Sequence, residues 1–157
     1  MIKIMFVCLG NICRSPMAEF VFKDLIKKQN LENKFYIQSS ATSSEEFGNP
    51  VHPGTRNKLA QYSISTHNKT SVQFTKKDYN KYDYIIAMET ANIAGIFNII
   101  KNDPQNKVSR LLDFTCCPRD IADPWYTGNF DKTYSDIYLG CSELLNKLII
   151  KHKLSSK

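Results

Sequence analysis

The first sixteen residues limit the fold of this chain more than any other segment. Residues 2–7 form a nearly continuous apolar run, which is typical of a strand buried on both faces of a parallel sheet. The run ends at Cys8, and a short polar loop follows. Ser15-Pro16 then gives a helix-start signal, in which serine caps the helix and proline occupies its first turn. This order of strand, loop and helix predicts an α/β fold.

The rest of the chain continues the alternation of strands and helices. Apolar residues at helical spacing predict a first helix that runs to about Gln29. Further strands are expected at residues 35–37, 84–88 and 108–112, and further helices at 55–62 and 90–100. We therefore expect one α/β domain over residues 1–157, with a parallel sheet, helices on both of its faces, and a ligand site at the carboxyl ends of the strands.

Two capping signals and one loop complete this prediction. Thr75 with Asp78 resembles a capping box that opens a short helix, and the stretch from Ser39 to Gly54 is predicted to be a long surface loop. A second pair, Thr133 with Asp136, predicts the start of a long amphipathic helix. Its expected apolar face includes Tyr134, Ile137, Tyr138, Cys141, Leu144, Leu145 and Leu148.

Composition and charge exclude several classes of protein. With 157 residues and 42% hydrophobic residues, the chain suits one compact domain, and it has no apolar run of the roughly 20 residues that a membrane span needs. Five cysteines are an odd number for a disulfide framework, so we expect a reducing, cytoplasmic location. The net charge of +6 favours anionic substrates. The clearest basic cluster lies at the end of a predicted terminal helix, where cations complement the helix dipole, so no nucleic-acid partner is expected. It comprises Lys147, Lys151, Lys153 and Lys157.

The segment from Cys8 to Arg14 has the features of an oxyanion-binding loop. A loop wrapped around one point presents its backbone N–H groups to an anion, and the following helix adds its positive dipole. Gly10 allows close approach, and Arg14 can bind two phosphate oxygens through its planar guanidinium. The same donors stabilise a thiolate, so Cys8 is expected to attack phosphorus and form a phosphocysteine. The intervening residues Leu9, Gly10, Asn11, Ile12 and Cys13 are candidate substrate-binding residues.

A general acid for the leaving group is expected at Asp123. Pro124 restricts the backbone at Asp123, and the adjacent Trp125 and Tyr126 can form a stacking wall for an aryl phosphate or, alternatively, pack in the core. Asp120 is a rival acid, but it lacks this proline and aromatic context.

Three segments together resemble the low-molecular-weight protein tyrosine phosphatases. They are VCLGNICRSPMAE at residues 7–19, SSATSSEEFGNP at 39–50 and ADPWYTGNF at 122–130, and they follow the family's order over nearly the whole chain. The resemblance implies a four-stranded parallel sheet of the phosphotyrosine protein phosphatase I-like, Rossmann-like kind. It also implies hydrolysis of protein phosphotyrosine or small aryl phosphates without a metal or other cofactor, and inhibition by phosphate or other oxyanions bound in the loop.

The resemblance also assigns roles to matching residues. Cys8 matches the nucleophile, Arg14 the phosphate-binding arginine and Asp123 the general acid, while Ser15 matches a hydroxyl that supports the departing thiolate. The remaining matches form two groups, a polar network that supports the loop (Asn11, Ser39 and His67) and the walls of the pocket (Leu9, Trp125 and Tyr126). Cys13 matches a cysteine that protects the nucleophile as a reversible disulfide, although simple packing under the loop is the alternative.

One position departs from the family pattern. Where the family usually has tryptophan or tyrosine in the recognition loop, this chain has Glu45. A carboxylate beside the phosphate site is expected to disfavour acidic peptides and to favour basic flanking residues.

Three other classes of protein use some of the same residue types. Arsenate reductases share this fold and a similar loop, but they need relay cysteines, and residues 79–100 contain none. A non-catalytic phosphopeptide-binding module needs neither Cys8 nor Asp123. A zinc site at Cys8 and Cys13 lacks a second half, because adjacent cysteines at 116 and 117 do not have the usual spacing. Cys116, Cys117 and Cys141 are therefore expected to be structural.

Overall fold

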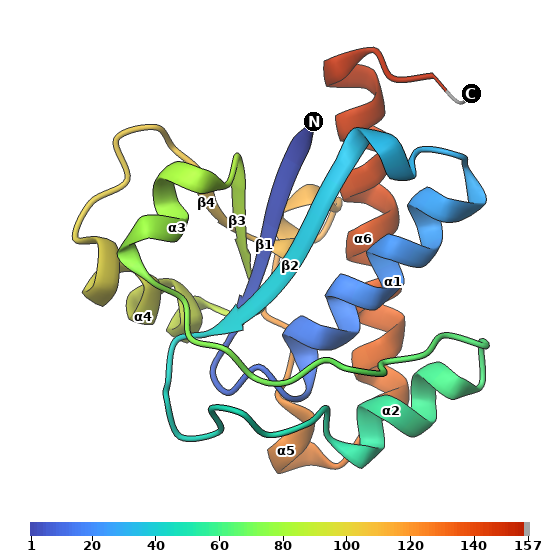
Figure 1. Ribbon diagram of the computed structural model, residues 1–157, viewed down its shortest axis with the longest axis vertical. Helices are drawn as coiled ribbons and strands as arrows, with labels where there is room; N and C mark the ends of the chain where they lie inside the picture. The colour runs from blue at the N-terminus through green and yellow to red at the C-terminus, as the bar shows by residue number, and fades with distance from the viewer. Residues whose placement is uncertain (156–157) are drawn as a thin grey trace.

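The sheet of this protein has four parallel strands. The computed structural model describes residues 1–155, so Lys157 of the basic cluster lies outside the described residues. Strands β1 (Ile2–Cys8), β2 (Phe35–Ala41), β3 (Tyr84–Ala87) and β4 (Val108–Arg110) pair in the order β2-β1-β3-β4 (Figure 1). The expected four-stranded parallel sheet is confirmed.

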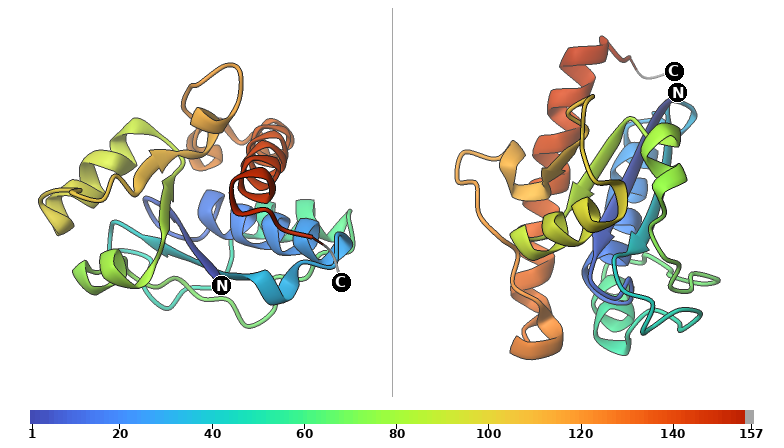
Figure 2. Two further views of the ribbon diagram at one scale, coloured as in Figure 1. Left: turned by 90° about the horizontal axis from the view of Figure 1, so that it is seen from above. Right: turned by 90° about the vertical axis from the view of Figure 1, so that its left-hand side faces the viewer.

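Helices cover both faces of the sheet, as the alternation predicted. Seen from above, the strands lie between α3 (Lys76–Lys81) and α4 (Thr90–Ile100) on one side and α1 (Arg14–Lys28) and α6 (Phe130–His152) on the other (Figure 2). Successive side chains of a strand point to opposite faces. In β1, Ile4 and Phe6 therefore pack toward α1 and α6, while Met5 and Val7 pack toward α3 and α4. Helix α2 (Pro53–Ala60) contacts α1 and α6.

Two predictions near the first loop need correction. Helix α1 begins at Arg14, and the residue that precedes it is Cys13, so Ser15 lies inside the first turn and does not cap the helix. Strand β2 continues beyond Ile37 to Ala41, because it pairs with β1 along its whole length and Ala41 lies opposite Cys8. Ser39 therefore belongs to a buried strand rather than to the predicted surface loop.

The long terminal helix also begins earlier than predicted. Helix α6 starts at Phe130, and the side chain of Asn129 caps it by accepting a hydrogen bond from the N–H of Lys132. Thr133 and Asp136 form no capping box here; Asp136 instead binds Arg119. Tyr138, which was expected on the apolar face, is exposed.

The remaining elements agree in part with the prediction. The capping box of Thr75 and Asp78 is present at the start of α3. The short helix α5 (Pro124–Thr127) and the 3-10 helices η1 (Glu32–Lys34) and η2 (Leu111–Phe114) were not predicted.

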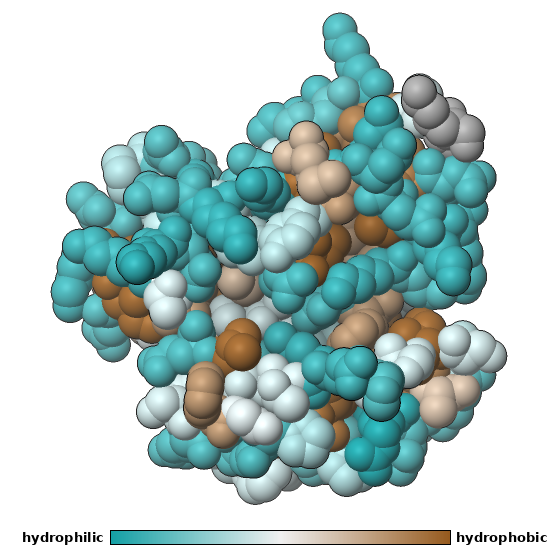
Figure 3. Space-filling model, in the orientation of Figure 1, coloured by the Kyte–Doolittle hydropathy of each residue, from teal (hydrophilic) through white to brown (hydrophobic). Residues whose placement is uncertain are grey.

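The visible surface is mainly hydrophilic. In the orientation of Figure 1, hydrophobic residues form small separate patches rather than one continuous area (Figure 3). Within residues 1–155, no helix is both long and apolar enough to cross a membrane.

Candidate active site

The candidate site lies at the carboxyl end of β1. Strand order reverses around β1, because β2 lies on one side of it and β3 on the other, and such a switch point leaves a crevice at the carboxyl ends of the strands. A cavity of about 140 Å³ opens there. It brings together most of the predicted site residues, and its lining comprises Cys8, Leu9, Gly10, Ile12, Cys13, Arg14, Ser43, Glu45, Glu46, Asp123, Trp125 and Tyr126.

The carbonyl groups of the Cys8–Arg14 loop point outward, toward neighbouring segments. Five of these carbonyls accept hydrogen bonds of 2.8–3.0 Å from neighbouring segments. The carbonyls of Cys8, Leu9 and Ile12 accept from the backbone N–H groups of Thr42, Ser43 and His52 in turn, and the carbonyls of Gly10 and Cys13 accept from the hydroxyls of Ser71 and Thr55. In a trans peptide the N–H points away from the carbonyl. The amides that follow these carbonyls therefore turn toward the inside of the loop, where an anion can accept from them.

A backbone amide and a hydroxyl lie close to the sulfur of Cys8. The N–H of Asn11 donates to Cys8 Sγ at 3.2 Å, and Ser15 Oγ lies 3.0 Å from the same sulfur. Asn11 has a left-handed backbone, with φ of 58°, which turns the chain back toward Cys8. The backbone of Gly10 is not left-handed. Glycine at this position instead allows the side chain of Glu46 to lie close to the loop, since an added Cβ would be 3.2 Å from Glu46 Cγ. The loop therefore surrounds a buried thiol with donors.

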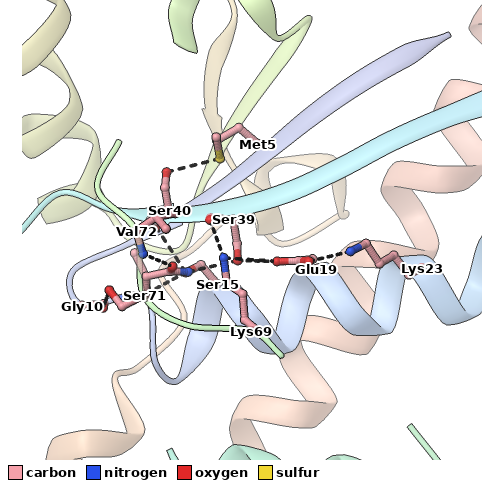
Figure 4. A network of polar contacts seen from close by, with 12 residues as sticks. Met5, Gly10, Ser15, Glu19, Lys23, Ser39, Ser40, Lys69, Ser71 and Val72 are labelled. Atoms are coloured by element: carbon pink, nitrogen blue, oxygen red, sulfur yellow. Dashed lines mark hydrogen bonds and ion pairs between the residues drawn. The ribbon is translucent and has the colours of Figure 1, made fainter. Parts of the chain in front are cut away.

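A buried polar network supports this loop from below. The side-chain amide of Asn11 donates to Ser15 Oγ at 2.8 Å and to Ser39 Oγ at 3.0 Å, and its oxygen accepts from the N–H of Val72. Figure 4 shows Ser15, Ser39 and Val72 gathered close together, and they come from α1, β2 and the segment that follows α2. The predicted supporting positions of Asn11 and Ser39 thus lie together.

His67 does not join this network, which corrects its predicted position. Its side chain is exposed, and its backbone N–H donates to Ser65 Oγ. Lys69, two residues later, takes the expected place: its Nζ donates to the carbonyl of Ser39 at 2.8 Å. Burial lowers the pKa of Lys69 below the usual lysine value, and the negative charge of Glu19 opposes that shift.

Arg14 is almost completely buried at the floor of the cavity, with 1% of its surface exposed. Its Nη2 lies 2.7 Å from Glu89 Oε2 and 3.2 Å from Asp123 Oδ2, and its Nη1 donates to the carbonyl of Ile121 at 2.8 Å. Sequence reasoning missed Glu89. A signal for it exists, because Glu89 follows the buried β3 at the same edge of the sheet where β1 ends at Cys8.

The two candidate acids lie in different surroundings. Asp123 lines the cavity, contacts Arg14, and caps α5 by accepting from the N–H of Trp125 at 3.0 Å. Asp120 instead accepts from Thr90 and Arg110 outside the cavity lining. Burial alone would raise the pKa of Asp120, but the hydrogen bonds from Arg110 and Thr90 hold it below its usual value. The geometry favours Asp123 as the proton donor.

The aromatic residues beside Asp123 lie at the rim rather than in the core. Trp125 is 58% exposed and Tyr126 is 78% exposed, and both line the cavity. The ring of His52 packs edge-on against the ring of Trp125, with 5.7 Å between the ring centroids. These positions suit a wall that contacts an aromatic substrate.

The other cysteines are of two kinds. Burial, together with the negative charge of Cys8, raises the pKa of Cys13 to about 12, and burial also raises the pKa of Cys141. Cys116 and Cys117 are both exposed and so do not pack in the core, whereas Cys141 is buried there. Over the described part of the chain, no group of three or more His, Cys, Asp or Glu side chains could hold a metal ion.

Comparison with known proteins identifies the family. The family model "Low molecular weight phosphotyrosine protein phosphatase" matches residues 3–154. Low molecular weight protein-tyrosine-phosphatase YfkJ of Bacillus subtilis is 41% identical over 147 residues, which cover 92% of this chain and 94% of the relative. Low molecular weight protein-tyrosine-phosphatase PtpA of Staphylococcus saprophyticus is 37% identical over 150 residues, 95% of each chain.

Solved structures agree with the sequence comparisons. The crystal structure of YfkJ has a TM-score of 0.93 at 40% identity and covers 98% of both chains. The crystal structure of SP-PTP, a low molecular weight protein tyrosine phosphatase from Streptococcus pyogenes, has a TM-score of 0.86 at 39% identity and covers 98% of this chain and 97% of its own. A thiol, an arginine and a carboxylate around an amide-lined loop define a phosphate-ester hydrolase. The chain belongs to the low molecular weight phosphotyrosine protein phosphatase family.

Proposed function

We propose that this enzyme hydrolyses protein phosphotyrosine and other aryl phosphates through a phosphocysteine on Cys8, without a metal ion. The observation that carries the proposal is the approach of the Asn11 N–H and the Ser15 hydroxyl to Cys8 Sγ, at 3.2 and 3.0 Å. Donors at these distances stabilise negative charge on the sulfur. The inward amides and Arg14 offer the same stabilisation to phosphoryl oxygens, so they can replace a cation.

The proposed reaction has two displacements. In the first, the thiolate of Cys8 attacks phosphorus, the bond between phosphorus and the ester oxygen breaks, and Asp123 protonates the leaving oxygen. In the second, water attacks the phosphocysteine, the carboxylate of Asp123 takes a proton from that water, and the sulfur–phosphorus bond breaks. Ser15 then supports the departing thiolate, and Arg14 binds equatorial oxygens in both steps.

The cavity rim supports a preference among substrates. Leu9, Trp125 and Tyr126 are exposed and apolar, which suits an aryl group between them. Glu45 and Glu46 also line the cavity. Their carboxylates favour basic residues next to the phosphotyrosine and disfavour acidic ones. The site also suits phosphate or other oxyanions as inhibitors.

The proposed chemistry requires a reduced thiol. All five cysteines are free, and oxidation of Cys8 would remove the nucleophile. A cytoplasmic location, which keeps thiols reduced, therefore stays our prediction.

A trapping experiment tests the covalent step. Rapid acid quenching of the enzyme with ³²P-labelled aryl phosphate should leave label on the wild-type protein and none on Cys8→Ser, and a chelator should leave the turnover rate unchanged. Label on Cys8→Ser, or activity lost to the chelator, would contradict the mechanism.

The acid is tested by its dependence on the leaving group. Asp123→Asn should slow the burst of product from phenyl phosphate by roughly 10²–10⁴-fold and that from a nitrophenyl phosphate much less, because nitrophenolate leaves without a proton. Asp120→Asn is the matched control, because the carboxylate of Asp120 lies outside the cavity lining. This variant should leave both bursts near the wild-type rate. Equal losses for both substrates would show that Asp123 is not the acid.

A further inference from the structure

Trp125 forms part of the cavity wall, although most of its surface is exposed. Because 58% of it is open to solvent, few protein atoms surround its ring and keep it in one orientation. The ring of His52 is one neighbour that does, since it packs edge-on against the Trp125 ring. His52 does not line the cavity itself. Any effect of its side chain on a bound aryl group therefore passes through Trp125.

The ring of His52 is itself held by two neighbouring groups. Its Nδ1 accepts a hydrogen bond of 2.9 Å from the N–H of Gly54, which caps helix α2. One face of the ring stacks on the ring of Phe130, with 5.2 Å between the centroids and 19° between the planes. The hydrogen bond sets the rotation of the ring, and the stack sets its plane. The ring that Trp125 contacts therefore has one fixed position.

Phe130 connects these rings to the hydrophobic core. It is partly buried and packs against the core cluster that includes residues of α1 and α6. Its ring also lies directly on the backbone of Gly54, where an added Cβ would overlap it. Phe130, His52 and Trp125 therefore form a row of rings from the core to the cavity rim. The row joins the starts of α6 and α2 to α5, and Figure 1 shows these parts near the carboxyl end of β1.

A wall that is fixed before binding favours ligands that stack on it. Ordering a mobile side chain at an interface lowers affinity, so a ring that is already ordered avoids that loss. An edge-on aromatic pair stabilises its own geometry beyond the area that it buries. An aryl group on the phosphorus gains from this arrangement. Inorganic phosphate does not, because it has no group that could stack on Trp125.

We propose that His52 is a positioning residue for the aryl group of the substrate, because its ring holds Trp125 in the orientation that the aryl group contacts. The proposal rests on the aryl preference proposed above. It assigns to His52 no contact with the substrate and no proton transfer. Substitution of His52 should therefore change the binding of aryl ligands and leave the binding of phosphate itself unchanged.

Two substitutions of His52 separate its ring from its helix cap. His52→Asn removes the ring but keeps a side chain that is preferred at the N-cap, whereas His52→Phe keeps a ring and loses the bond to Gly54. The backbone N–H of residue 52, which donates to the carbonyl of Ile12, is present in both variants.

Calorimetry with benzylphosphonate and with inorganic phosphate measures the two affinities without turnover. His52→Asn should weaken benzylphosphonate binding by about 2–10-fold, which is the range that one aromatic pair gives, and should leave phosphate binding unchanged. His52→Phe should keep the wild-type affinity for both ligands. His52→Ser, which also caps without a ring, carries the same expectation as His52→Asn and is measured in parallel in case that variant does not fold.

Fluorescence reports on the ring of Trp125 directly, because Trp125 is the only tryptophan of the chain. Acrylamide should quench this emission more strongly in His52→Asn than in the wild type or in His52→Phe, since the ring that shields one side of Trp125 is removed. The matched control is His152→Asn, because His152 also packs edge-on against an aromatic ring, that of Tyr84, but lies outside the cavity lining. This control should change neither the affinities nor the quenching.

A double substitution tests whether His52 acts through Trp125. Adding His52→Asn to Trp125→Ala should weaken benzylphosphonate binding no further, because the ring that His52 positions is then absent. An unchanged ratio of the two affinities in folded His52→Asn, an equal loss in His52→Phe, or a further loss in the double variant would overturn the proposal. Equal affinity of the wild type for benzylphosphonate and phosphate would instead refute the proposed aryl preference. Acrylamide quenching would then still show whether His52 holds Trp125, so the two failures are distinguishable.

Discussion

Replacing Arg14 with lysine keeps a positive charge at the floor of the cavity but removes the planar guanidinium. In the structure, two different nitrogens of Arg14 are in use, Nη1 on the carbonyl of Ile121 at 2.8 Å and Nη2 on Glu89 at 2.7 Å. A lysine has one nitrogen, and it cannot bind both of these groups and also grip two phosphoryl oxygens. The substitution therefore loses the bond to Ile121 and one of the two contacts to the phosphoryl group.

The size of the expected loss in rate follows from the phosphoryl contact alone, because the bond to Ile121 is present in the free enzyme and its loss lowers stability instead. A hydrogen bond that involves a charged group contributes about 1.5–3 kcal/mol. At 1.36 kcal/mol for each factor of ten in rate, Arg14→Lys should lower kcat/KM by roughly 10–10²-fold. The charge itself is retained, so the loss measures geometry rather than attraction.

Steady-state kinetics with phenyl phosphate, together with the thermal unfolding midpoint, measure this loss. Arg110→Lys is the matched control, because Arg110 also binds two carboxylates, those of Asp113 and Asp120, but does not line the cavity. It should leave kcat/KM within about twofold of wild type. If Arg14→Lys unfolds at the wild-type temperature and keeps more than a tenth of wild-type kcat/KM, bidentate binding of the phosphoryl group by Arg14 is refuted.

Two further predictions concern Glu45 and Cys13. Glu45→Gln should weaken the preference for phosphotyrosine peptides with lysine flanks over peptides with glutamate flanks, by about 2–5-fold in kcat/KM, since one exposed charge contributes at most about 1 kcal/mol; an unchanged preference contradicts its role. For Cys13, whose pKa is raised to about 12 by burial and then by Cys8, the thiolate fraction rises tenfold per pH unit between 7 and 9. Attack by Cys13 on peroxide-oxidised Cys8, which expels hydroxide and forms the disulfide, should therefore protect more thiol-recoverable activity at pH 9 than at pH 7. If Cys13→Ser recovers as much activity as the wild type at both pH values, Cys13 only packs under the loop.

The parts of the site that the sequence revealed are local in the chain. Cys8 and Arg14 lie six positions apart in one loop, and the apolar strand before it and the helix after it fix where that loop must lie. Asp123 was found for a similar reason, because Pro124 and the aromatic residues after it mark a rigid segment, which in the structure is the start of α5. Local patterns therefore predicted the fold, the thiol, the arginine and the aspartate together.

The missed residues depend on contacts between distant segments. Glu89 lies 75 positions from Arg14, and Lys69 lies 30 positions from Ser39. Two isolated bridges hold the segment around Lys69 near the loop: Gln73 pairs with Ala41 at the end of β2, and Thr70 pairs with Pro50. No spacing rule in the sequence contains these bridges, so His67 was the natural but wrong choice for the third supporting position.

The parallel sheet explains why these distant residues meet at all. All four strands end at one edge, so the residue that follows each strand is delivered to the same place without any long-range signal in the sequence. After β1 comes the loop that ends at Arg14, after β2 the segment with Ser43 and Glu45, and after β3 comes Glu89. The chain beyond β4 then brings Asp123 to the same cavity. In a fold of this kind, a search for polar residues directly after each buried strand would have found Glu89, whereas Lys69, which follows no strand, would still have been missed.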